Sequence, residues 1–142
     1  MMNVLAKRFD DLKAGHPVQL FKSHRDGIAD GDQRRDFIYV DDVVRVIMWL
    51  LSAPSTNGIF NVGTGKARSF RELMLAGYAA LGHQPNIEYV DMPDAIRDSY
   101  QYFTEATTVR LRAAGYNGGF TSLEDAVKSY VGNFLSCADQ YR

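Results

Sequence analysis

The 142-residue sequence has one cysteine, Cys137, so no disulfide can form within the chain. It also lacks a long hydrophobic run. The most apolar stretch, residues 43–51, is interrupted by Arg45 and is far shorter than the roughly 18 residues that span a membrane. Residues 1–15 contain no apolar core of the kind found in secretory signals. We therefore expect a cytoplasmic protein with no membrane partner.

A basic excess is missing as well, because 16 Lys and Arg residues stand against 17 Asp and Glu residues. Proteins that bind nucleic acids usually carry a positive excess, so we expect no nucleic-acid partner. The three histidines, His16, His24 and His83, lie far apart without a pattern of carboxylates around them, so no metal site is predicted. Apolar residues make up 46% of the chain, which is enough for the core of a globular domain.

Three motifs of nucleotide-dependent enzymes are absent. Gly63-Thr64-Gly65 follows an expected strand, but the third glycine of a dinucleotide fingerprint is replaced by Arg68. The P-loop spacing from Gly58 to Gly63 fails too, because Thr64 follows where lysine is needed. No Tyr-x-x-x-Lys occurs, a spacing that places an ammonium beside a phenol on one helical face and lowers the phenol pKa. The chain is therefore predicted to contain a tight turn at 63–65, no cofactor-binding residues and no catalytic residues.

The hydrophobic pattern alternates between short strands and helices, which predicts an α/β fold. Capping boxes at Ser69–Glu72 and Thr121–Glu124 predict two helix starts, and Asp41 or Asp42 is expected to cap a third. That third helix is apolar nearly all round and is expected to be buried on several sides. Helices are predicted at residues 1–14, 43–51, 70–81, 107–114 and 122–135, strands at 18–21, 37–40, 58–62 and 86–90, and a loop at 93–102.

Two segments carry chemistry. In the run from Arg34 to Asp42, a charged loop enters a strand. Arg35, at the end of this loop, either binds a phosphate through two N–H groups or forms a salt bridge with a nearby carboxylate. In the run 97–103, an aromatic-rich loop places Tyr100 either over a ligand or in the core. The pattern alone leaves both alternatives open.

The run Arg35-Asp36-Phe37-Ile38-Tyr39-Val40-x-Asp42 resembles the C-terminal signature of the extended short-chain dehydrogenase/reductase superfamily. Within it, the chain is similar to the ADP-L-glycero-D-manno-heptose 6-epimerase family. Four segments carry that similarity, and together they extend over most of the sequence: 20–23 (LFKS), 58–65 (GIFNVGTG), 100–104 (YQYFT) and 111–116 (LRAAGY).

This resemblance implies an NAD(P)-binding Rossmann-like fold of which the chain would be the C-terminal substrate-binding portion, with the main Rossmann domain outside it. Residues 1–15 would form a helix that packs on that domain. The enzyme would bind NADP there and invert C6 of ADP-heptose by transient oxidation, for lipopolysaccharide inner-core synthesis. The full-length enzyme would be a homo-oligomer. The implied substrate-binding residues are Phe21, Lys22, Ser23, His24, Arg35, Tyr100 and, where some members have histidine, Lys7.

The resemblance also leads us to expect that Met1 corresponds to an internal methionine of a longer enzyme and that this chain is inactive by itself. Two alternatives stay open. One is part of another nucleotide-sugar epimerase or dehydratase of the same superfamily. The other is a nucleotide-sugar-binding module without catalysis.

Overall fold

The computed structural model describes residues 4–137, so the part of the predicted first helix at residues 1–3 lies outside it. Helices and strands alternate along the chain, which confirms the α/β class. The elements are α1 (Val4–Lys7), α2 (Phe9–Ala14), β1 (Val18–Phe21), β2 (Arg34–Arg35), α3 (Val40–Ser52), β3 (Arg68–Ser69), α4 (Phe70–Leu81), β4 (Ile87–Val90), α5 (Asp94–Arg97), α6 (Val109–Ala113), α7 (Leu123–Tyr130) and the π-helical turn η1 (Val131–Leu135).

Two small sheets organise the chain. β1 and β4 pair in parallel, from Val18 opposite Ile87 to Phe21 opposite Val90. β2 and β3 pair antiparallel, and Arg34 also forms a single parallel bridge to Phe103. Because β1 and β4 run in the same direction, the loops that leave their carboxyl ends start from the same edge. This edge carries most of the candidate functional residues.

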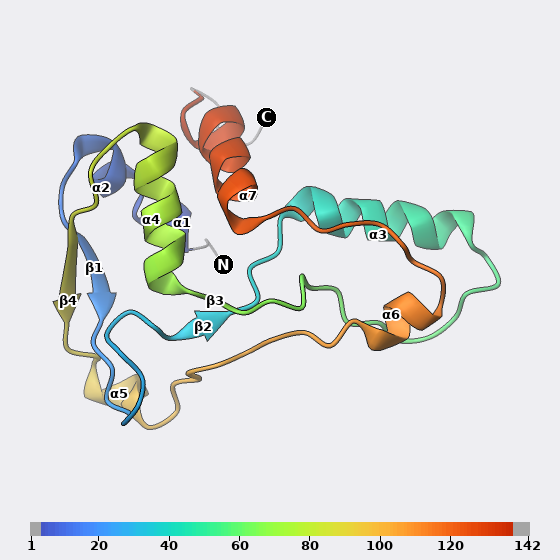
Figure 1. Ribbon diagram of the computed structural model, residues 1–142, viewed down its shortest axis with the longest axis horizontal. Helices are drawn as coiled ribbons and strands as arrows, with labels where there is room; N and C mark the ends of the chain where they lie inside the picture. The colour runs from blue at the N-terminus through green and yellow to red at the C-terminus, as the bar shows by residue number, and fades with distance from the viewer. Residues whose placement is uncertain (1–3, 138–142) are drawn as a thin grey trace.

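The larger core is formed by α1, α2, α4, α7 and the strands β1 and β4, with α4 between the strands and α7 (Figure 1). α4 starts at the predicted capping box: the Ser69 hydroxyl accepts from the Glu72 amide, and the Glu72 carboxylate accepts from the Ser69 amide. Residues 4–14, predicted as part of one helix, form α1 and α2 with a break at Arg8, and their apolar face is buried in this core. The most buried residues of the larger core, at 6% exposure or less, are Leu5, Phe9, Leu12, Val18, Leu20, Leu73, Met74, Tyr78, Val127, Val131 and Leu135.

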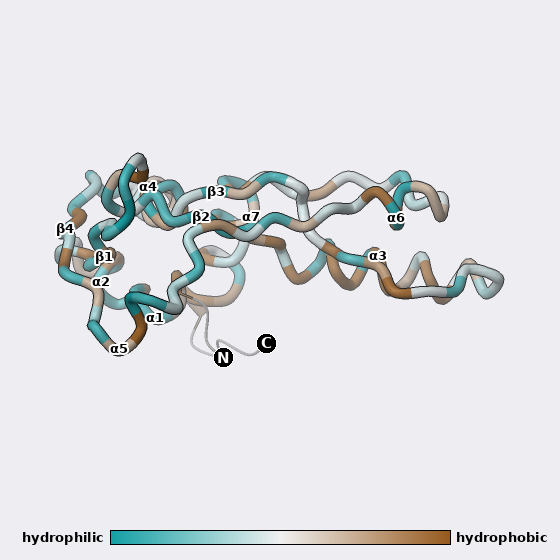
Figure 2. The backbone as a smooth tube through the Cα atoms, turned by 90° about the horizontal axis from the view of Figure 1, so that it is seen from below, coloured by the Kyte–Doolittle hydropathy of each residue, from teal (hydrophilic) through white to brown (hydrophobic). Residues whose placement is uncertain are grey.

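A second, smaller core lies at the other end of the molecule, where α3 and α6 lie together (Figure 1). Val46, Leu111 and Tyr116 are buried there, and Trp49 packs edge-on against Tyr116 with ring centroids 5.3 Å apart. Several apolar residues of α3 are exposed, and hydrophobic stretches are visible along it in Figure 2. The prediction that this helix is buried on several sides is wrong for the described chain: Val40, Val44, Ile47, Met48 and Leu51 are 48–72% exposed.

The predicted strands at 37–40 and 58–62 do not form, although both segments are rich in apolar residues. Phe37 packs edge-on against Phe70, with centroids 5.5 Å apart, and Val40 already begins α3. Phe60 and Val62 pack against the second core. The physical reason is the same in both cases: within residues 4–137 no neighbouring strand pairs with these segments, so their side chains pack without a hydrogen-bonded ladder.

Three helix starts also differ from prediction. α3 begins after Tyr39 without a side-chain cap, since the fully buried Asp42 carboxylate instead accepts from the Thr121 amide and hydroxyl, both at 2.8 Å. Thr121 is thereby occupied, and the cap of α7 is Ser122, which accepts from the Asp125 amide. The predicted loop at 93–102 contains the single-turn helix α5, Asp94–Arg97.

Candidate functional site

Two segments that lie against each other follow the carboxyl ends of β1 and β4. The first loop, residues 22–33, follows β1, and the second loop, residues 91–103, follows β4. In sheets with parallel strands, ligands bind in the crevice at the carboxyl ends. The Lys22 ammonium, just after β1, pairs with the Asp91 carboxylate, just after β4, at 3.3 Å. Four of the predicted site residues, Phe21 to His24, end β1 or follow it directly, so they lie at this edge.

The first loop is held against the second by hydrogen bonds that involve His24. Its backbone N–H donates to the Tyr102 hydroxyl at 3.0 Å, and its ring Nε2 accepts from the Met92 amide at 3.4 Å. The amide of Ser23 donates to the Asp30 carboxylate at 2.7 Å, which closes the first loop on itself. The Arg25 guanidinium lies 4.8 Å above the Tyr102 ring. These contacts fix the loop backbone, so the predicted residues Ser23 and His24 are held in place.

Arg35 and Tyr100, far apart in the sequence, are neighbours. The Arg35 guanidinium carbon lies 5.4 Å from the centre of the Tyr100 ring and 5.7 Å from that of Phe70. Tyr100 in turn packs edge-on against Phe21, with ring centroids 6.1 Å apart. Within residues 4–137 Arg35 forms no ion pair; one of its N–H groups donates to the Arg34 carbonyl at 2.7 Å. Of the two alternatives for Arg35, the structure therefore does not contain the carboxylate pair.

A cavity of about 400 Å³ lies between α1, the β1 edge and Tyr100. Three predicted residues, Lys7, Phe21 and Tyr100, line it, together with Gln33 and Phe70. Burial raises the pKa of the Tyr100 phenol above its ordinary 10.0; the positive charge of Arg35 opposes this shift and Tyr102 adds to it. The phenol is therefore protonated at neutral pH and can donate a hydrogen bond. The cavity combines three aromatic rings, two basic side chains, Lys7 and Arg8, and one such donor.

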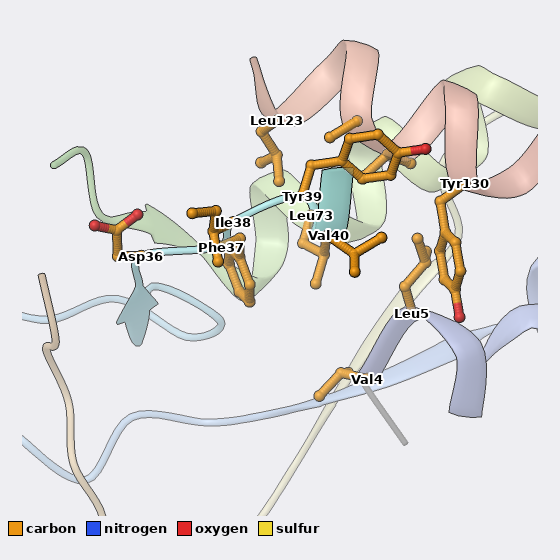
Figure 3. Close-up of a pocket in the computed structure, with 12 residues that line it drawn as sticks. Val4, Leu5, Asp36, Phe37, Ile38, Tyr39, Val40, Leu73, Leu123 and Tyr130 are labelled. Carbon is orange, nitrogen blue, oxygen red and sulfur yellow. The ribbon is translucent and has the colours of Figure 1, made fainter. Parts of the chain in front are cut away.

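A second cavity, of about 490 Å³, lies between α1, α4, α7 and the segment 36–40 (Figure 3). Its lining is almost entirely apolar, with Asp36 at one end and the tyrosines of positions 39 and 130 among the walls. The Tyr39 hydroxyl is already hydrogen-bonded to Ser129 at 2.9 Å. None of the predicted site residues lines this cavity, and its walls offer little to a charged ligand.

The turn at 63–65 does not offer its amides to a phosphate. The Asp36 carboxylate accepts from the Thr64 amide at 2.8 Å, the Gly65 amide at 2.9 Å and the Ala106 amide at 3.1 Å. A carboxylate in this position occupies the donors and repels an anion. The prediction of a structural turn is confirmed, and this turn does not fit the phosphates of a dinucleotide. Residues 4–137 also contain no cluster of potential metal ligands.

Sequence reasoning missed two residues that shape the site, Gln33 and Asp36. Asp36 follows Arg35 in the signature run, and its place in that run was the available signal. Gln33 is only 1% exposed, and nothing in the sequence distinguishes it from a solvent-exposed loop glutamine.

Comparison with known proteins relates this geometry to a family. The sequence model of the NAD dependent epimerase/dehydratase family matches residues 1–63. The ADP-L-glycero-D-manno-heptose-6-epimerase of Nitratidesulfovibrio vulgaris (strain DP4) is 48% identical over 141 residues, which are 99% of this chain and 44% of that protein. The chain thus spans less than half the length of this curated relative.

Two solved structures share the fold. The UDP-glucose 4-epimerase of Thermus thermophilus, in complex with NAD, is 27% identical with a TM-score of 0.68, over 88% of this chain and 37% of that one. The ADP-L-glycero-D-manno-heptose-6-epimerase of Helicobacter pylori superposes with a TM-score of 0.71 at 24% identity, over 94% and 37%. By sequence and by fold, the chain is similar to proteins of the NAD dependent epimerase/dehydratase family, and by sequence to the ADP-L-glycero-D-manno-heptose-6-epimerases.

Proposed function

We propose that this chain is the substrate-binding portion of an NADP-dependent epimerase that inverts C6 of ADP-glycero-manno-heptose. Similarity to this family supports the reaction class, and the 48% identical relative supports the substrate. The product would feed the synthesis of the lipopolysaccharide inner core, and the whole enzyme would work as a cytoplasmic homo-oligomer. No helix within residues 4–137 is long and apolar enough to cross a membrane.

The observation that carries this proposal is the position of Arg35. Its guanidinium has no carboxylate partner among the described residues and lies over Tyr100, at the edge where the β1 and β4 loops meet. A planar guanidinium grips two oxygens of a diphosphate at once, which a lysine cannot do. Phe21 and Tyr100 would pack against the flat parts of the ligand, and the protonated phenol would donate to one of its oxygens. Lys7, Lys22, Ser23 and His24 would complete the contacts.

NADP would supply hydride transfer to and from C6. We propose that residues outside 1–142 bind this cofactor. The described residues support this proposal, because the amides of the 63–65 turn are occupied by Asp36. The sequence also has no Tyr-x-x-x-Lys for proton transfer. What these residues would contribute is orientation of the ADP-sugar, and orientation alone accounts for a large share of many rate enhancements.

One alternative has an observation in its favour. The structure of a UDP-glucose 4-epimerase superposes on 88% of this chain at 27% identity, so a different nucleotide sugar would fit the same fold. The other alternative, a binding module without catalysis, predicts that residues 1–142 fold cooperatively alone and bind a nucleotide sugar.

Calorimetric titration of the full-length enzyme with ADP-L-glycero-D-manno-heptose and with UDP-glucose tests the proposal. We expect the ADP-sugar to bind at least about 10-fold more tightly, which corresponds to about 1.4 kcal/mol. Equal affinities, or a preference for UDP-glucose, would favour the first alternative. If the 142-residue protein is monodisperse and binds the ADP-sugar as tightly as the full-length enzyme does, the result would favour the binding module without catalysis.

A further inference from the structure

Gln33 is one of three polar side chains that are buried among the described residues. The other two are accounted for: Asp42 holds Thr121, and Ser69 caps α4. The side-chain amide of Gln33 donates to two successive backbone carbonyls, those of Phe21 at 3.3 Å and Lys22 at 3.2 Å. A primary amide has two N–H groups, so both are used at the start of the loop that follows β1.

This position is where β1 leaves the sheet. The Lys22 amide still donates to the Val90 carbonyl at 2.8 Å, in continuation of the β1–β4 ladder. On the other side, the Gln33 carbonyl accepts from the Phe70 amide at 3.1 Å, which anchors the glutamine backbone to the start of α4. Its side chain therefore ties the beginning of the first loop to the segment that enters β2.

The hydrogen bonds from the Gln33 side chain also determine how far the start of the first loop lies from Arg35. Arg35 is two residues beyond Gln33 in β2, and Phe21 contacts Tyr100, which lies under the Arg35 guanidinium. Gln33 itself lines the 400 Å³ cavity with Phe21 and Tyr100. Loss of its donors would leave the part-buried Lys22 carbonyl without this partner, and the loop start would move to find another.

We propose that Gln33 is a positioning residue of the nucleotide-sugar site, which holds Phe21 and Lys22 in register with Arg35. The inference rests on the proposed function and adds to it a residue that acts through Phe21 and Lys22. Gln33 fixes the position of the loop before the reaction begins. Loss of its side chain therefore affects binding of the ADP-sugar more than the chemical step.

The test compares Gln33→Leu with Gln84→Leu in the full-length enzyme. Leucine fills the buried space but donates no hydrogen bond, and Gln84 is an exposed residue between α4 and β4. Because misplacement of a binding group by about 1 Å is costly, we expect Gln33→Leu to raise the KM for ADP-L-glycero-D-manno-heptose about 10-fold, with kcat within about twofold of wild type. Gln84→Leu should leave both unchanged. A purely structural role would lower the melting temperature of Gln33→Leu and leave its KM at the wild-type value.

A second variant keeps the proposal testable if Gln33→Leu fails to fold. In Gln33→Glu, a protonated carboxyl can still donate one hydrogen bond, whereas the ionised form faces two carbonyl oxygens. Burial raises the pKa of such a group, so the KM of Gln33→Glu should approach the wild-type value as the pH falls from about 8 to about 6. The ratio of variant to wild-type KM corrects for any pH dependence of the wild type itself.

The outcomes separate the two proposals. A wild-type enzyme that neither binds nor turns over ADP-L-glycero-D-manno-heptose overturns the proposed function. Wild-type turnover together with a folded Gln33→Leu enzyme of unchanged KM overturns only the positioning role. A KM ratio for Gln33→Glu that does not change with pH overturns it as well.

Discussion

The Asp36 carboxylate accepts a hydrogen bond from the Thr64 backbone amide at 2.8 Å. The Thr64 hydroxyl and the amides of Gly65 and Ala106 donate to the same carboxylate, so one side chain holds together three distant segments. Asp36 directly follows Arg35, and the network therefore also fixes the strand that presents the guanidinium. Burial alone would raise the pKa of Asp36, but these four hydrogen bonds outweigh it and lower the pKa below the ordinary 3.8.

The lowered pKa predicts how acid affects this network. A carboxyl whose pKa is lower in the folded state stabilises the fold fully above its unfolded pKa, near 3.8, and loses that contribution as the pH falls through the folded value. Asp36→Asn should therefore lower the free energy of unfolding by about 1–3 kcal/mol at neutral pH, and the gap to wild type should close below about pH 3.8. Urea unfolding of both proteins from neutral to acid pH measures this. A gap that stays constant over the whole range would contradict the role of the charge.

Gly63 should not tolerate a side chain. A Cβ at this position would lie 2.5 Å from the Ala106 side chain and 2.7 Å from the Asp36 carboxylate, and both distances are too short to exist without movement. Gly63→Ala should therefore destabilise the fold by about 1–3 kcal/mol, as overpacking does. Gly119→Ala is the matched control, because a Cβ there meets nothing within 4 Å. Equal melting temperatures for the two variants would show that the turn yields easily.

The sequence predicted the elements whose signals are local. The Ser69–Glu72 capping box, the strands at 18–21 and 86–90, and the buried face of α2 form within about one residue of expectation. Strands at 37–40 and 58–62 were wrong because a strand needs a partner, and a short apolar run does not show whether one is present. Thr121 was wrongly assigned as a cap because its actual partner, Asp42, is 79 residues away.

The site shows the same division between local and distant information. The runs containing Arg35 and Tyr100 were identified as functional candidates from composition and resemblance, and the structure brings these two side chains together. Their roles in substrate binding stay predictions. Gln33 could not have been found, because its significance lies in the distance from its amide to the carbonyls of Phe21 and Lys22. Such a distance follows from tertiary packing and leaves no trace in spacing or composition.

The 142-residue protein should bind no NADP and show no epimerase activity. A dinucleotide needs a glycine-rich turn with free amides, and here the turn amides of Thr64 and Gly65 are held by Asp36. The acid–base pair of a Tyr-x-x-x-Lys motif is absent too. Calorimetry with NADP should therefore give no heat of binding, and ADP-L-glycero-D-manno-heptose should stay unconverted. Saturable NADP binding by this protein would reject our proposal that NADP is bound outside residues 1–142.

The 142-residue protein should also self-associate through α3. Ile47, Met48 and Leu51 are 50%, 60% and 72% exposed, and they lie within one and a half turns of the same helix. Contiguous apolar surface of this kind promotes association. Leu51→Glu should shift the protein toward the monomer in sedimentation velocity, whereas Gln84→Glu, which adds the same charge elsewhere, should not. A wild-type protein that is already a sharp monomer with a cooperative melt would contradict the prediction.

Arg35 should contribute more than its charge to substrate affinity in the full-length enzyme. Its guanidinium is packed on Tyr100 and has no carboxylate partner among the described residues, so its fork is free to grip two oxygens of the diphosphate. Arg35→Lys keeps the charge but loses the fork and the stacking. Hydrogen bonds to charged groups are worth about 1.5–3 kcal/mol, so Arg35→Lys should weaken binding of the ADP-sugar about 10-fold, and Arg35→Ala up to about 100-fold.

The neighbouring Arg34 provides the matched control for this series, since its exposed side chain belongs to the same strand. Arg34→Ala should leave the affinity for the ADP-sugar near wild type, and none of these variants should change the affinity for NADP. Because Arg35 stabilises no carboxylate in the described chain, its variants should melt close to the wild-type temperature. A folded Arg35→Ala enzyme with wild-type affinity would reject the phosphate role. A variant that unfolds would instead show that the contact with Tyr100 and Phe70 is structural.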